Sequence, residues 1–498
     1  MEEGLKRKIF YIFIIINAIL WSLLQSVRSV MSIDSMEAIS WGELISFGTN
    51  KHPPLTGWLA APFYNLSGHH DIAIYILGQI CILVGFIYIY KLAKNFLNEE
   101  KAICSVLILQ SCYYYTYNIF IDNFNCNIIL LGLWPMIAYY FYQSIKLNKL
   151  KDWFLFGLFS GLAFLGKYQI AFFLLSLFVY ILIADRKQFC KKGIWIAFIT
   201  GILVISPHII WVYNHDFFCL AYMINRAESD VVEISILQNV FNRLLYPLKF
   251  YADQILAVLG CVGMFIITAL QTKEKITLNK ITDNTDKIFL LSIFFIPIIS
   301  LGLLGTITGN RVPGIWGSTM AGYTGLILFY FFNVKFNVDT FKFFVKLSAI
   351  VLAGSIIAVF VFWTVQTKRY ISIPIDKITS DINAEWAKET NNAPLKYVGG
   401  DLRYSFVYRY YNPVKPHTIL ETFGYKNPWE DHTDILNSGA IILTTKAEDL
   451  ESKTKEFIIL LPKDYQINQQ EYTYNICNKF KSCEEDTLYY TIIPPQND

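Results

Sequence analysis

The chain is poor in charge. Asp, Glu, Lys and Arg make up only 16% of its 498 residues, whereas hydrophobic residues make up 54%. A soluble globular domain carries about 25% charged residues, so this composition excludes an ordinary soluble enzyme. The 42 basic and 39 acidic residues leave a formal net charge of +3, and bulk charge therefore recruits neither nucleic acid nor an acidic partner.

Several functional motifs are also missing. The 7 His residues show no zinc-type spacing, and the chain has neither a Gly-rich nucleotide cradle nor a Walker motif. No internal repeat or low-complexity run is present. ATP-driven transport and cytosolic nucleotide-sugar chemistry therefore lack their usual sequence support.

The chain has instead a series of apolar blocks of bilayer length. Blocks this long and uniformly apolar are typical of membrane-spanning helices and not of barrel strands. The first follows Lys6, Arg7 and Lys8, is longer than a signal-peptide core and lacks a small-residue cleavage site, so we expect a retained anchor. We expect eleven crossings, at about residues 9–29, 71–93, 102–118, 127–143, 153–166, 168–184, 193–213, 252–271, 288–307, 318–334 and 344–366.

The scarce basic residues indicate the orientation. With a cytoplasmic N-terminus, the short inside segments hold twenty Lys and Arg, and the outside segments up to residue 366 hold seven. This bias is the one that the positive-inside rule predicts. The seven outside cations are Arg28, Lys51, Lys167, Arg226, Arg243, Lys249 and Arg311.

We expect two domains: a membrane domain over residues 1–366, whose first outer loop covers about residues 30–70, and a tail over residues 367–498. An odd number of crossings places the tail outside. Its composition is mixed, and it predicts a small α/β domain. The expected strands are Lys396–Val398, Ala440–Thr444, Phe457–Leu461 and Leu488–Ile493.

Cys477 and Cys483 are the only Cys pair in the tail, and the other seven Cys lie in or beside the apolar spans. A disulfide between them suits an oxidising compartment. Two separate thiols are the alternative, because spacing alone does not set the distance between the Cα atoms.

The first outer loop combines acids, bases and aromatic residues. If Asp34–Ile45 is helical, Asp34 and Glu37 share one face beside Trp41, and this arrangement suits a general base. The alternative is a capping box in which Asp34 is the N-cap and Glu37 the N3 residue. Further on, Pro53 and Pro54 restrict the backbone around Lys51 and His52. This element is either a binding element or the corner before an interfacial helix.

Other ionisable residues also occupy predicted outer ends. Asp122 lies in a loop too short to leave the headgroup plane, and it is a functional candidate or another helix cap. Lys167 is the only cation in an apolar stretch of about thirty residues. A buried Lys needs an anion, and a lipid phosphate is available there; a Lys reaching the headgroups from a helix end is the alternative.

Three more side chains complete the predicted outer set. Arg226 and Arg311 suit bidentate contact with phosphate, or they anchor the chain at the headgroups. For His208, in Ser206-Pro207-His208, we expect a core histidine with its hydrogen bonds satisfied, and a hydrogen bond to a substrate is the alternative.

These residues resemble a known family, the bacterial branch of the dolichyl-phosphate-mannose protein mannosyltransferase-like (PMT/ArnT-type) glycosyltransferases, which have the GT-C membrane fold. Asp34–Ala38, Trp41 and Lys51–Leu55 are similar to the family's first loop, in which a DE-type acidic pair precedes an HPP-L element. The family's Glu falls on Ser35, which is a departure. Further similar blocks follow in the family's order: Phe120–Trp134, Gly161–Tyr168, Ser206–Trp211, Trp316, Val398–Asp401 and Asn427–Trp429.

The resemblance implies an inverting transferase that moves a sugar from a polyprenyl-phosphate donor to an acceptor on the outer face. Asp34 would deprotonate or orient the acceptor, and Glu37 and Asp122 are further acidic candidates. The residues implied at the donor phosphate are Lys167, Arg226, Arg311, Lys51 and His52. No cofactor is implied with certainty, and a divalent metal is left open.

The sequence thus predicts a polytopic α-helical, GT-C-like protein of the bacterial inner membrane with a periplasmic α/β domain. The predicted partners are the polyprenyl-phosphate-linked sugar, membrane lipids and a glycolipid or protein acceptor, with lipid A preferred and no nucleic acid. Protein O-mannosyltransferase-type activity is the alternative within the class. A transporter predicts inverted repeats and mid-membrane ionisable residues, and an envelope-assembly scaffold would need none of the outer candidates.

Overall fold

A computed structural model describes residues 2–220, 236–280, 283–365, 373–420, 430–462, 464–478, 480 and 482–496. The chain forms two compact units. One comprises Met1–Gln25 and Ile45–Val359 and is called the membrane unit here; the other comprises Ser26–Leu44 and Phe360–Asp498 and is called the C-terminal unit. Residues 26–44, expected within the membrane domain, therefore group with the tail.

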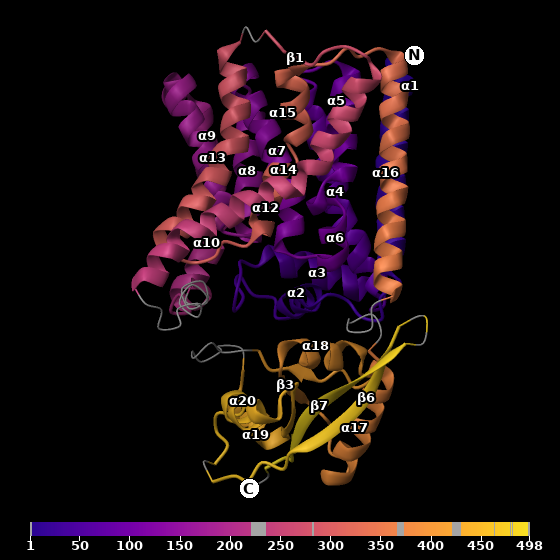
Figure 1. The fold of residues 1–498 in the computed structure, drawn as a ribbon. Coiled ribbons are helices and arrows are strands. Elements are labelled where there is room, and N and C mark those ends of the chain that lie inside the picture. Colours follow the sequence, from indigo (N-terminus) through magenta and orange to yellow (C-terminus); the bar gives the residue numbers. More distant parts are fainter. Residues whose placement is uncertain are drawn as a thin grey trace. The chain divides into compact units, whose positions relative to one another are not determined.

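In its described residues, the membrane unit is mainly helical and has one pair of two-residue strands. Its apolar segments form helices because a helix satisfies all of its own backbone hydrogen bonds, and an unsatisfied backbone amide is costly in lipid. Among them, α4, α7 and α8 pack next to one another (Figure 1). The elements are α1 (Glu3–Gln25), α3 (Leu55–Leu66), α4 (Asp71–Ala93), α5 (Glu99–Leu107), η1 (Ile108–Ser111), η2 (Tyr113–Tyr115), α6 (Tyr117–Asp122), α7 (Cys126–Leu147), α8 (Leu150–Gly166), α9 (Ile170–Ala184), η3 (Arg186–Cys190), α10 (Lys192–Asn214), α12 (Ile236–Gln271), β1 (Thr277–Leu278), α13 (Asn284–Thr308), η4 (Gly314–Gly317), α14 (Ser318–Ala321), α15 (Thr324–Phe331), β2 (Phe332–Asn333) and α16 (Val338–Val365).

Each expected span coincides with helical structure. Within the described residues, seven helices are long and apolar enough to cross a membrane: α1, α4, α7, α10, α12, α13 and α16. The other expected spans fall on the shorter helices α8 and α9 and on two interrupted segments, α5–α6 and α14–α15. The count of eleven crossings stays a prediction.

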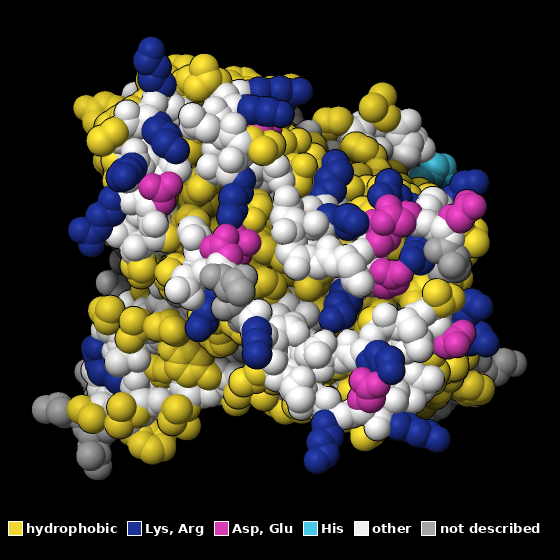
Figure 2. All heavy atoms as spheres, turned by 90° about the horizontal axis from the view of Figure 1, so that it is seen from above, with side chains coloured by type: hydrophobic (Ala, Val, Ile, Leu, Met, Phe, Trp, Pro, Cys, Tyr) yellow, Lys and Arg dark blue, Asp and Glu magenta, His cyan; other side chains and the backbone are white. Residues whose placement is uncertain are grey.

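Charged residues gather at the end of the membrane unit where α1 begins. Figure 2 looks onto this end and shows many Lys and Arg side chains with fewer Asp and Glu. Glu99, at the start of α5, accepts hydrogen bonds from Arg7 (3.2 Å), Lys94 (2.6 Å) and Tyr90 (2.6 Å). Lys6 pairs with Glu100. These contacts tie α1, α4 and α5 together at the end predicted to be cytoplasmic.

Helices α4 and α7 approach closely because glycines lie between them. A Cβ atom on Gly85 would lie 2.4 Å from the Leu131 carbonyl oxygen, and one on Gly132 would lie 2.8 Å from that of Cys81. Small residues allow such backbone contact, which is a main source of helix association in membranes.

The C-terminal unit contains a five-stranded mixed sheet with strand order β4-β3-β5-β7-β6. The β3 strand is parallel to β4 and β5, whereas β5–β7 and β6–β7 are antiparallel. One face, with Tyr397, Ala440 and Ile442, packs against Ile435 and Phe457 of the helices α19 and α20. The elements are α2 (Ile33–Glu43), α17 (Ile375–Glu389), β3 (Tyr397–Gly400), α18 (Leu402–Tyr411), β4 (His417–Thr418), α19 (His432–Ser438), β5 (Ala440–Thr444), η6 (Ala447–Asp449), α20 (Leu450–Phe457), β6 (Gln470–Cys477) and β7 (Cys483–Ile493).

The predicted α/β character of the tail is confirmed, with one strand wrong. Residues Phe457–Leu461 are the end of α20 and a following turn. Their side chains Phe457, Ile458 and Leu461 are buried against the sheet. A short apolar run is easily interpreted as a strand from sequence alone, and here it is the last residue of a helix followed by a turn.

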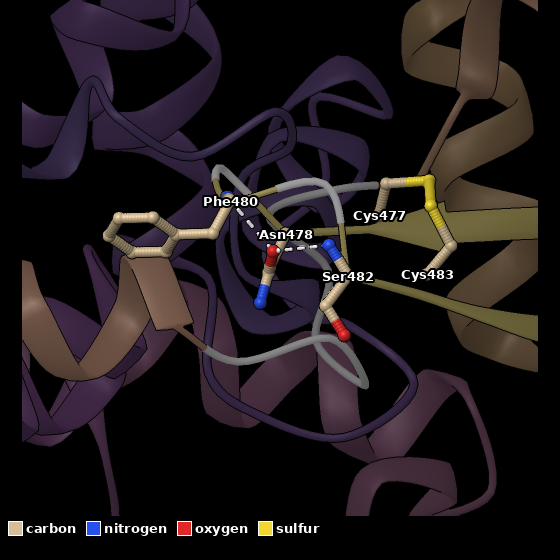
Figure 3. Close-up of a disulfide and its surroundings, with 5 residues drawn as sticks. All are labelled: Cys477, Asn478, Phe480, Ser482 and Cys483. Atoms are coloured by element: carbon tan, nitrogen blue, oxygen red, sulfur yellow. Dashed lines mark hydrogen bonds between the residues drawn. A yellow bond between two sulfur atoms is a disulfide. The ribbon is translucent and has the colours of Figure 1, made fainter.

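A disulfide joins the ends of β6 and β7. Cys477 and Cys483 are opposite one another in the hairpin, with their Cα atoms 4.0 Å apart (Figure 3). Inside the loop, the Asn478 side-chain oxygen accepts from the backbone N–H groups of Phe480 (2.9 Å) and Ser482 (3.0 Å). The bridge therefore closes a turn that is already ordered by hydrogen bonds.

We predict that Gly85→Ala lowers the free energy of unfolding by about 1–3 kcal/mol, because the new methyl group overlaps the α7 backbone. Thermal unfolding of the detergent-solubilised protein measures this. The matched control is Gly263→Ala in α12, where a Cβ meets nothing within 4 Å and Ala favours the helix. Equal unfolding temperatures for both variants would contradict the close α4–α7 packing.

Candidate functional site

The turn between α8 and α9 holds a buried ammonium group. Lys167 ends α8, and only 7% of the residue is exposed. Its Nζ donates to Asn127 Oδ1 in the first turn of α7 (2.6 Å) and lies 4.9 Å from the centre of the Trp316 ring. The contacts with Asn127 and Trp316 orient the ammonium and partly compensate its burial.

The segment after α13, which ends in the 3₁₀ turn η4, brings Trp316 to this position. The Gly314 carbonyl accepts from the Tyr114 hydroxyl (2.6 Å) and from Gln254 Nε2 (3.0 Å), and the Gln169 side-chain amide donates to the Trp316 carbonyl. A Cβ on Gly317 would lie 1.7 Å from Gln254 Oε1, so a larger residue there would displace the Gln254 side chain. The segment is thus fixed to α12 and to the α8–α9 turn.

The neighbouring Tyr168 takes part in a second contact chain. His208 of α10 is 1% exposed; its Nδ1 lies 2.6 Å from the Phe47 carbonyl and its Nε2 lies 2.7 Å from the Tyr168 hydroxyl. A carbonyl oxygen only accepts, so Nδ1 donates to it, and Nε2 of the neutral ring accepts from Tyr168. The prediction of a core histidine with its hydrogen bonds satisfied is confirmed.

This chain of contacts anchors the loop that carries Lys51 and His52. Besides the Phe47 contact, the Trp58 indole donates to the Ser46 carbonyl (2.9 Å). The Thr49 hydroxyl oxygen accepts from the backbone N–H groups of Lys51 (3.2 Å) and His52 (2.8 Å). The Lys51 side chain is largely buried, and the prolines that follow lead into the expected helix, α3.

The acidic helix α2 belongs to the C-terminal unit. Its N-cap is Ser32, whose hydroxyl accepts from the backbone N–H of Ser35 (3.2 Å). Asp34 therefore lies in the first turn and is exposed, whereas Glu37 is buried. The alternative of a capping box formed by Asp34 and Glu37 is wrong, because the serine two residues earlier occupies the cap.

The remaining candidates differ in their surroundings. Asp122 is the last residue of α6 and accepts from the Asn118 amide (3.0 Å). It does not cap α7, since Asn125 does so by accepting from the N–H groups of Asn127 and Ile128. The Arg311 side chain is exposed. Arg226 lies outside the described residues.

The structure divides the predicted set between the two units. Lys51, His52, Asp122, Lys167 and Arg311 belong to the membrane unit, and Asp34 and Glu37 belong to the C-terminal unit. Within the described ranges, no group of three or more His, Cys, Asp and Glu residues is arranged to hold a metal ion.

Sequence reasoning missed the partners that hold Lys167 and its loop. Asn127 begins an expected span, and Gln254 lies near the start of another. Asn127 is half-buried in the first turn of α7, and Gln254 is buried in the middle of α12. The available signal was a polar residue near the predicted outer end of a span. The sequence alone does not show which other segment such a residue contacts.

The Val398–Asp401 block turns from β3 into α18. Gly400 has φ +104°, and a Cβ there would lie 2.0 Å from the Leu443 carbonyl oxygen. Burial favours the neutral form of Asp401, but the Lys453 ammonium (2.9 Å) and the Thr445 backbone N–H (2.8 Å) outweigh it and lower the pKa of this carboxyl. The ionised Asp401 therefore ties the β3 turn to the end of β5.

We predict that His208→Ala loosens the loop before α3, because Phe47 and Tyr168 lose their partner at a cost of about 1–3 kcal/mol each. Limited proteolysis should cleave the segment 45–54 faster, and the unfolding temperature should fall. Ser206→Ala is the control, since its hydroxyl bonds only within α10, to the Leu203 carbonyl. Equal cleavage rates in both variants would show that His208 does not hold the loop.

Comparison with known proteins gives a family match and a fold match. Residues 51–211 match the family described as dolichyl-phosphate-mannose-protein mannosyltransferase. A lipid A galacturonosyltransferase, RgtD of Rhizobium johnstonii, is 22% identical over 240 residues. These residues are 48% of this chain and 48% of that protein, so the match spans about half the length of the curated relative.

Solved structures of ArnT from Cupriavidus metallidurans resemble almost the whole chain. The form bound to undecaprenyl phosphate and the apo form both have a TM-score of 0.59, with 11% and 12% identity. Each comparison covers 96% of this chain and 97% of ArnT. The match over residues 51–211 and the shared fold confirm the resemblance that the motifs predicted, to the PMT/ArnT-type glycosyltransferases with the GT-C fold.

Proposed function

We propose that this chain is an inverting glycosyltransferase of the inner membrane that moves a sugar from a polyprenyl-phosphate donor to a cell-envelope glycolipid such as lipid A. The observation that carries the proposal is the buried Lys167 ammonium, held by Asn127 and the Trp316 ring. The ArnT structure with undecaprenyl phosphate supports the donor class, and the named activity of RgtD supports the acceptor.

The donor phosphate is assigned to Lys167. An ammonium in a site of low dielectric attracts an anion more strongly than one in water. As the bond between the anomeric carbon and the phosphate oxygen breaks, the departing polyprenyl phosphate gains charge, which the ammonium stabilises. Lys51, His52, Arg226 and Arg311 are proposed as further phosphate contacts.

The acceptor is assigned to Asp34. The acceptor oxygen attacks the anomeric carbon from the face opposite the phosphate, so the configuration at that carbon inverts. An exposed, ionised carboxylate takes the proton of an acceptor hydroxyl when it lies within hydrogen-bond reach; for a phosphate acceptor it orients the group instead. Glu37 and Asp122 are proposed in supporting acidic roles.

The proposed orientation has the N-terminus in the cytoplasm and the C-terminal unit in the periplasm. The cluster of Lys and Arg at the end where α1 begins supports it (Figure 2). A protein acceptor is the second candidate, because the matched family is described as transferring mannose to protein. The transferred sugar in either case is a hexose or an amino sugar.

We predict that Lys167→Ala raises the KM for a polyprenyl-phosphate sugar at least about 30-fold, because it removes the buried charge that holds the phosphate. Initial rates with the purified protein and a radiolabelled donor measure this. Lys249→Ala, an exposed outer cation on α12, serves as the control and should keep the wild-type KM. An unchanged donor KM for Lys167→Ala would rule out the phosphate role.

For Asp34→Asn we expect kcat to fall by about 10²–10⁴ with an unchanged donor KM if the acceptor is a hydroxyl. Mass spectrometry of envelope lipids and glycoproteins from cells with wild-type protein, this variant or none identifies the sugar and acceptor. The control is Asp216→Asn, an exposed residue with φ 49°, a conformation that Asn tolerates. Wild-type transfer by correctly inserted Asp34→Asn protein would disprove the assigned role.

A further inference from the structure

Helix α2, which carries Asp34, packs on α18 of the C-terminal unit. Two polar contacts join this helix and its preceding residues to the end of α18. Arg409 forms an ion pair with Glu43 at the last residue of α2, and the Met31 backbone N–H donates to the Tyr411 hydroxyl (2.7 Å). The two contacts hold both ends of the acidic helix.

The Arg409 side chain is itself held in place. It is 11% exposed, its Nη1 lies 3.4 Å from His417 Nδ1, and its guanidinium lies 5.3 Å from the centre of the Tyr410 ring. His417 begins β4 and lies 3.5 Å from the Glu430 carboxylate. Because the edge of the sheet restrains Arg409, its ion pair with Glu43 fixes the position of the end of α2.

A third contact restrains the residues that enter α2. The Arg28 guanidinium lies 5.4 Å from the centre of the Trp363 ring, and its Nε donates to the Val30 carbonyl (3.3 Å). At the other end, Ile45 has φ 42°. This value is unfavourable for a β-branched residue and marks a sharp change of direction where the chain returns to the membrane unit.

We propose that contacts within the C-terminal unit fix the position of the acidic helix α2, with Arg409, Glu43 and Tyr411 as positioning residues for Asp34. The proposal rests on the glycosyltransferase function assigned above and adds a task for the tail. A displacement of about 1 Å at a reacting group costs roughly 10²-fold in rate, so contacts distant from the chemistry control turnover. Substitutions at these contacts should leave the binding of the donor phosphate unchanged.

The test compares Arg409→Gln, Glu43→Gln and the milder Tyr411→Phe in the full-length protein. We expect kcat to fall roughly 10- to 100-fold in the first two and less in the third, with the donor KM unchanged. The exchanged pair Glu43→Arg with Arg409→Glu should recover part of the loss. The control Asp434→Asn breaks the Lys396 ion pair elsewhere in the same unit and should keep the wild-type kcat.

Hydrogen–deuterium exchange gives a readout that needs no activity. Residues 33–43 should exchange faster in Arg409→Gln and Tyr411→Phe than in the wild type or in Asp434→Asn. If Asp34→Asn is inactive but the Arg409 and Tyr411 variants keep the wild-type exchange and kcat, the positioning proposal is overturned and the proposed function is not. If the wild type transfers no sugar from the donor, the proposed function fails, and faster exchange would still establish the structural link between α18 and α2.

Discussion

The burial of one ammonium group organises the predicted outer end of the membrane unit. Taking Lys167 out of water is costly unless its surroundings compensate, and the compensation comes from separate parts of the chain. Asn127 begins α7, and Trp316 lies on a loop that Tyr114 and Gln254 fix. The next residue, Tyr168, connects the same turn to α10 and, through His208, to the loop before α3. A change at Lys167 is therefore expected to affect the start of α7, the segment with Trp316 and the loop before α3.

The two charged groups that are proposed to take part in the reaction belong to different units of the chain. The proposed phosphate-binding cation lies among apolar helices, where its field is weakly screened. The proposed acceptor acid is exposed on a helix of the α/β unit. An exposed carboxylate is accessible to an acceptor, and an ammonium among apolar helices attracts an anion more strongly than one in water. Each group thus has the environment that its assigned task requires, and one environment would not serve both.

Hydropathy was sufficient to locate the helices of the membrane unit, because a span must be apolar over its length. It did not show that two spans are interrupted, since 3₁₀ turns and short helices have the same composition. Composition gave the α/β class of the tail, but the run at Phe457–Leu461 has no periodicity that separates a strand from a buried helix end. The grouping of residues 26–44 with the tail depends on pairs such as Glu43 and Arg409, which lie hundreds of residues apart. No local pattern reveals such pairs.

The departure at Ser35 has a structural explanation in the cap of α2. Ser35 is the third residue of this helix, and both its N–H and its hydroxyl contact the Ser32 side chain. A Glu there would keep the backbone bond to Ser32 but replace this hydroxyl contact. Glu37 shares the helix with Asp34, yet it is buried while Asp34 is exposed, so it does not present its carboxylate as the missing partner would. Of the two acids on α2 to which the resemblance points, Asp34 is the exposed one, and its position depends on the helix that carries it.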